Sequence, residues 1–179
     1  MDSGFDILIG TPPAIATALA EELARAADVL ARIDNADYTA KSRTSGSVGE
    51  HFRHNLNFVE SVLNGMKLGR IDYAKRMRDV RVETDRSFAA ERFNEAITRL
   101  MFLNQCDVGK EVSVLSEVNG SIAYRSSVGR ELEFAHSHTV HHHALIAEKL
   151  WVLGVEVDVL FGVAPSTKKY WEAQRPSNC

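Results

Sequence analysis

Residues 127–154, SVGRELEFAHSHTVHHHALIAEKLWVLG, carry one long helical pattern. The apolar side chains on one face of this segment are Leu132, Ala135, Ile146, Leu150 and Leu153. Their spacing fits the period of about 3.6 residues of an amphipathic helix. Ser126 or Ser127 supplies an N-cap, and Gly154 ends the pattern. The segment therefore predicts a helix that ends near Leu153 and needs other helices to cover its apolar face.

Three earlier segments show the same periodicity and supply those helices. The first covers about residues 16–33, the second begins at a cap on Ser45 or Ser47 and stops at Asn64-Gly65, and the third covers about residues 85–103. Four helices of about 20 residues with short joins are typical of a bundle. The sequence predicts a mainly α protein built as a four-helix bundle.

A small β-hairpin is predicted between the third and fourth helices. The β-prone runs 110–118 and 121–126 flank Asn119-Gly120, and an Asn-Gly pair favours the tight turn of a hairpin. A lone hairpin is marginally stable in water, so we expect it to pack on the helices.

The remaining segments are short and suggest no second domain. Residues 38–46 are rich in Thr, Ser and Gly and predict a loop. Ser166 predicts the cap of a short last helix. Since no flexible linker or internal repeat divides the chain, we expect one helical-bundle domain over residues 1–179.

The composition excludes several classes of protein. The 179 residues include 21 Lys and Arg against 24 Asp and Glu, a formal charge of −3, so no basic face for nucleic acid is expected. No apolar run of about 18 residues is present, and we expect no membrane span. The apolar start, Phe5 to Ile9, is too short for a signal peptide. Cys106 and Cys179 form no disulfide framework, which favours a reducing, cytoplasmic location.

Histidine is concentrated on two of the predicted helices. The seven histidines are His51, His54, His136, His138, His141, His142 and His143. In the later group only His138 and His142 stand four residues apart, so they lie one turn apart on the same helix face. Neutral imidazole is the commonest transition-metal ligand, and this spacing presents two rings together.

A third ligand has to come from another helix, where His51 and His54 are both available. Three histidines leave an open position for water or substrate, as in catalytic metal sites. We expect His141 to face solvent. His136 and His143 lie on the other flank of the apolar face and are interpreted as packing residues or as hydrogen-bond partners of a ligand.

Other charged residues are not expected to bind the metal directly. Glu131 precedes His138 by about two turns. It is a candidate to hydrogen-bond to the nitrogen of a ligand histidine that does not face the metal. The charged side chains between residues 72 and 86 predict ion pairs on a solvated helix start, in preference to a role in substrate binding. No general acid or base stands out.

Three segments of the chain resemble the DinB superfamily of DinB/YfiT-like metalloenzymes. They are SVGEHFRHNL (residues 47–56), IDYAKRMRD (71–79) with ETD (83–85), and SVGRELEFAHSHTVHHH (127–143). The resemblance covers about residues 14–155. It implies a four-helix bundle that holds a divalent ion, commonly nickel or zinc, with three histidines. Carried over to this chain, the ligands are His54, His138 and His142, and His51 stays the alternative on the earlier helix.

The expected function follows from such a site. A divalent ion lowers the pKa of a bound water or thiol, and either then becomes a nucleophile at neutral pH. We therefore expect an enzyme that uses a divalent metal for hydrolysis or S-transfer on a small molecule. The family includes thiol transferases, which makes a thiol cofactor an option. The basic and amide residues that usually follow the second ligand histidine are replaced here by His143, Ala144 and Leu145, which argues against that cofactor.

The alternative is a non-catalytic, metal-binding helical module that acts through dimerisation. The resemblance also implies a homodimer formed through bundle helices. Alanines on more than one face of the first helix, between Ala14 and Ala31, would allow a second helix to approach closely.

Overall fold

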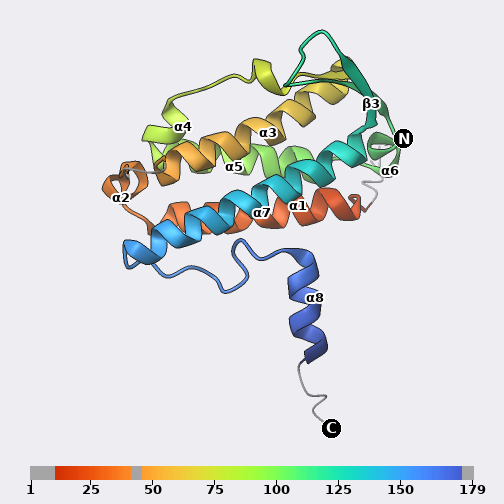
Figure 1. The fold of residues 1–179 in the computed structure, drawn as a ribbon. Coiled ribbons are helices and arrows are strands. Elements are labelled where there is room, and N and C mark those ends of the chain that lie inside the picture. The colour runs from red at the N-terminus through yellow and green to blue at the C-terminus, as the bar shows by residue number, and fades with distance from the viewer. Residues whose placement is uncertain (1–10, 42–45, 175–179) are drawn as a thin grey trace, which may run out of the picture.

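Four long helices form the body of the protein in the computed structural model, which describes residues 11–41 and 46–174 (Figure 1). They are α1 (Ala14–Arg32), α3 (Val48–Leu68), α5 (Arg86–Met101) and α7 (Val128–Val152). Helix α1 packs on α5 and α7, and α3 packs on the same two helices. The four helices thus enclose one core, and the predicted four-helix bundle is confirmed.

Local capping signals fix where α3 begins and ends. The side chain of Ser47 accepts from the backbone N–H of Glu50 at 3.0 Å, and Glu50 accepts in return from the N–H of Ser47 at 2.7 Å. The alternative cap, Ser45, lies outside the described residues. The predicted stop at Gly65 is wrong, because α3 continues to Leu68 and ends at Gly69, whose φ is +66°.

Gly65 has a packing role instead. A Cβ at this position would lie 2.5 Å from Cγ1 of Ile71, so only glycine lets the chain return this close to α3. The residues that return, Arg70–Ile71, form strand β1.

The predicted hairpin is present and belongs to a three-stranded sheet. Its strands are β2 (Glu111–Leu115) and β3 (Ala123–Ser127), which pair antiparallel and are shorter than predicted. Strand β1 joins β2 in parallel, giving the order β1-β2-β3. The sequence did not predict β1 because two residues carry no alternation. The last residue of β3, Ser127, caps α7, so the sheet leads directly into that helix.

Short helices connect these elements: α2 (Asn35–Thr39), the 3-10 helix η1 (Tyr73–Lys75), α4 (Arg81–Thr84) and α6 (Gln105–Val108). A further helix, α8 (Pro165–Gln174), follows α7. The loop predicted at 38–46 is wrong at its start, because residues 38 and 39 belong to α2. The side chain of Asp34 caps this helix, and the Tyr38 side chain is fully buried. Helix α8 begins at Pro165, one residue before the predicted cap Ser166.

The core lies between the four long helices. Its largest fully buried side chains include Leu19, Leu23, Phe52, Phe93, Leu100 and Leu132. Among the described residues, no helix is both long and apolar enough to cross a membrane. Helices α3 and α7 pack directly on each other, and all seven histidines are carried by these two helices.

Candidate metal centre

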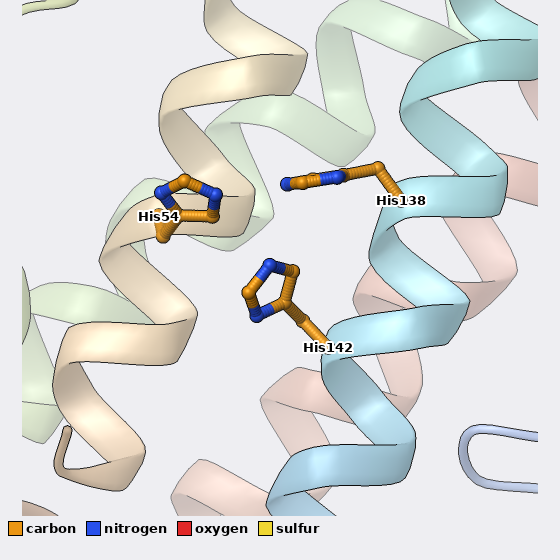
Figure 2. Close-up of side chains that lie close together, drawn as sticks. All are labelled: His54, His138 and His142. Carbon is orange, nitrogen blue, oxygen red and sulfur yellow. The ribbon is translucent and has the colours of Figure 1, made fainter. Parts of the chain in front are cut away.

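Three histidine side chains meet between α3 and α7. His54 comes from α3, and His138 and His142 come from successive turns of α7 (Figure 2). One nitrogen of each ring lies within 4.8 Å of the others. The ring centroids are 4.6 to 4.9 Å apart in all three pairs. The rings therefore surround one point, as three ligands of a single ion do.

His51 lies next to this cluster and contacts one of its members. Its Nδ1 is 3.0 Å from Nδ1 of His142, a hydrogen-bond distance. His142 then has only Nε2 left for an ion. If Nε2 of His142 held an ion, the proton of this ring would be on Nδ1 and would be donated to Nδ1 of His51, which would fix the orientation of the His142 ring. The structure thus places His54 in the cluster and His51 behind it.

Burial keeps the three rings neutral. Desolvation is the largest cause in each case and lowers the pKa of His54 and His138 to about 4 and that of His142 to about 3. Neighbouring positive charges, among them Arg76 beside His54, lower these pKa values further. At neutral pH each ring therefore offers a free lone pair. Nε2 of His138 is buried without a hydrogen-bond partner, which suits coordination of an ion.

These pKa values predict how metal binding depends on pH. Protons and metal ions compete for the same lone pairs, and these rings take up protons only near pH 3 to 4 instead of near 6.5. We expect the affinity for a divalent ion to change little between about pH 7.5 and 5 and to fall steeply below about pH 4. Titration with Co²⁺ at a series of pH values measures this. A tenfold loss between about pH 7.5 and 6 would contradict the lowered pKa values.

Glu131 is buried but does not support the histidines. Its two carboxylate oxygens accept hydrogen bonds from the hydroxyls of Tyr73 at 2.7 Å and Ser126 at 2.6 Å. The expectation that Glu131 hydrogen-bonds to a ligand is therefore wrong. It instead anchors η1 and the end of β3 to the first turns of α7. Tyr73 stacks in turn on Phe58, whose ring centroid is 4.1 Å from that of His138.

The other histidines of α7 do not join the cluster. His141 is exposed, as expected, and its ring meets that of His142 edge-on at a centroid distance of 5.3 Å. His136 and His143 are buried, and the His143 ring stacks on Phe161 at 4.3 Å. Nδ1 of His143 also lies 3.4 Å from a carboxylate oxygen of Glu22 on α1. His143 thus packs the segment between α7 and α8 against the bundle, on a different side of α7 from His142.

The charged segment before α5 contains a residue that the sequence interpretation missed. The pair Asp79–Arg81 is exposed, as predicted. The side chain of Arg76, in contrast, is only 12% exposed, and its guanidinium lies 4.5 Å from the centroid of the Phe58 ring. For Arg76 the expectation of a solvated position is wrong. Nothing in the local sequence distinguishes it from its neighbours.

A pocket of about 420 Å³ adjoins the cluster on the side of His51. It is mainly apolar and is lined by Ala40, Lys41, Val48, His51, Leu145, Glu148, Lys149, Val152 and Leu153. Because His51 contacts both this pocket and His142, the pocket is separated from the cluster by one side chain.

A solved structure shares this architecture. The crystal structure of a DinB-like protein, YjoA from Bacillus subtilis, superposes with a TM-score of 0.65 over 83% of this chain and 99% of that one, at 18% identity. FK506-binding protein 5 from Rhizopus delemar is 30% identical over 108 residues, which are 58% of this chain but only 28% of that protein's length. No family model matches the chain.

Proposed function

From the DinB-like fold of this chain and its three-histidine cluster, we propose that the protein is a divalent-metal-dependent enzyme. His54, His138 and His142 are the proposed ligands. The observation that carries the proposal is the convergence of three neutral imidazoles from two helices. An arrangement with three protein ligands and a free position is typical of catalytic metal sites.

The chemistry proposed for this site is hydrolysis or S-transfer. A divalent ion held by three neutral histidines lowers the pKa of water toward about 7 or deprotonates a thiol, and supplies a nucleophile at neutral pH. The protein's own part is to hold and orient the ligands. His51 fixes the ring of His142, while Phe58, which is less than 5% exposed, packs against the ring of His138 at a centroid distance of 4.1 Å.

The proposed substrate is a small molecule. The pocket beside His51 has the volume and apolar lining of a small-molecule site and would hold the apolar part of such a substrate. Imidazole ligands suit zinc and nickel, and these are the proposed ions.

The thiol cofactor, the homodimer and the cytoplasmic location remain predictions from sequence and resemblance. Ala14, Ala24 and Ala31 are exposed on α1, where a second copy could pack.

Metal analysis and chelation test the proposal. We expect about one zinc or nickel ion per purified chain. A chelator should remove it without unfolding the bundle, because the four helices enclose an apolar core that does not include the ligands. Metal content and far-ultraviolet circular dichroism, measured before and after chelation, report the two results separately. A chain that binds no divalent ion would refute the proposal, and one that unfolds on chelation would show a structural ion.

A further inference from the structure

We propose that Arg76 binds an anionic oxygen group, a carboxylate or a phosphate, of the ligand that occupies the open position of the three-histidine site. This inference rests on the proposed function and specifies its substrate class. The contacts of Arg76, the burial of its guanidinium and the charges near it support the inference.

Arg76 is held in place over the aromatic ring that packs against the cluster. It follows η1 directly, and η1 is fixed by the hydrogen bond from the Tyr73 hydroxyl to Glu131 of α7. The guanidinium lies over the ring of Phe58 at 4.5 Å. The same ring has centroid distances of 4.1 Å to His138 and 4.9 Å to His54. One aromatic side chain therefore contacts Arg76 and two of the three proposed ligands.

The guanidinium of Arg76 lacks a close acceptor. Its Nη1 is buried and makes no hydrogen bond, although the group carries a full positive charge. The carboxylate of Glu117, on the turn between β2 and β3, lies 3.8 Å away, too far for a hydrogen bond. Arg53, on α3, is by comparison satisfied by Glu83 at 2.7 Å. A buried donor without an acceptor is costly, and an incoming oxyanion would supply the acceptor.

The charge of the site points to the same ligand. His54, His138 and His142 are all neutral, so the net charge of an ion bound to them stays positive. Arg76 adds a further positive charge, which is close enough to lower the pKa of both His54 and His138. Two positive groups in a partly buried site repel each other unless an anion binds between them. The arrangement thus favours a negatively charged ligand over a neutral one.

Glu117 acts as a competitor in this arrangement. Its side chain is 47% exposed, and it faces Arg76 across a long ion pair. An ion pair this long, with one partner about half exposed, contributes little stability. An oxyanion that bonds to the guanidinium directly would replace Glu117, whose carboxylate can turn to solvent.

Anion titration of the Co²⁺-loaded protein tests the proposal. The visible spectrum of bound Co²⁺ reports changes at its open position, and acetate and inorganic phosphate serve as separate probes. We expect at least one probe to bind saturably to the original protein. Arg76→Met, which keeps an apolar side chain over Phe58, should weaken that binding by about tenfold to a hundredfold, because charged hydrogen bonds are lost. Arg76→Lys should lie between the two, since it keeps the charge but loses the planar fork.

Two further variants control the result. Glu117→Gln removes the competing carboxylate and should strengthen anion binding several-fold. Arg99→Met removes the same charge from α5, where Arg99 bonds to Asn64, and should bind anions as the original protein does. Equal Co²⁺ content in all variants shows that the fold and the histidines are intact.

The possible failures can be told apart. If the original protein takes up no Co²⁺, the proposed function is wrong and this inference falls with it. If Co²⁺ binds but neither probe changes its spectrum, or if Arg76→Met binds the probes as tightly as Arg99→Met, only the role of Arg76 is refuted.

Discussion

The His142→Ala variant should lose metal affinity by more than about a hundredfold. Loss of a group that merely orients a ligand typically costs about tenfold to a hundredfold, and His142 is itself a proposed ligand. His142 is also central to the cluster, since its ring lies against both His54 and His138 and hydrogen-bonds to His51. Competition with a chromophoric chelator measures the affinity of each variant.

The chain offers a matched control one residue away. His141→Ala removes an exposed imidazole that touches the His142 ring edge-on at 5.3 Å but is not one of the three clustered histidines, and it should lower the affinity far less than His142→Ala does. His51→Ala should give an intermediate loss of about tenfold to a hundredfold, because it removes only the partner that orients His142. Equal affinities of His142→Ala and His141→Ala would show that the ion, if bound, is held elsewhere.

The second large effect concerns stability. Phe52→Ala should lower the free energy of unfolding by about 3–5 kcal/mol, a large part of the stability of an ordinary domain. The Phe52 side chain is fully buried. It packs edge-on against Phe93 and His143 at centroid distances of 5.4 and 6.1 Å, so its removal leaves a cavity where α3, α5 and α7 meet. Urea unfolding of the metal-free protein measures the loss.

An exposed phenylalanine provides the comparison. Phe102, which directly follows α5, is 68% exposed, and Phe102→Ala should change the free energy of unfolding by less than about 0.5 kcal/mol. A loss below about 1 kcal/mol for Phe52→Ala would mean that this part of the core is loosely packed.

The helices could be predicted because their signals are local. The apolar period, the Ser47–Glu50 capping box and the cap at Ser127 all lie within a few residues of the ends that they determine. Gly65 shows where such local signals fail. The pair Asn64-Gly65 is typical of a helix end, but glycine is needed here because Ile71 lies against it. That contact depends on how the chain folds back after α3. Strand β1 escaped prediction for the same reason, since its pairing with β2 is its only signal.

The site could be predicted in part, for a related reason. The spacing of His138 and His142 is a property of one helix and is visible in the sequence. The choice between His51 and His54 depends on how α3 packs against α7, which helical periodicity alone does not fix. Arg76 lies in an irregular segment, where no period tells a buried side chain from an exposed one. Its burial over Phe58 became visible only in three dimensions.

The origin of the three histidines from two distant helices has a consequence for biosynthesis. His54 and His138 are separated by more than eighty residues, so an ion that joined them in the unfolded chain would have to close a loop at a cost of about 4–5 kcal/mol in chain entropy. Helix α7 alone presents the pair His138 and His142, but all three rings come together only after α3 and α7 have docked. The proposed ion is therefore acquired late, by a folded protein. Its identity in a cell then depends on which free divalent ions are available at that moment.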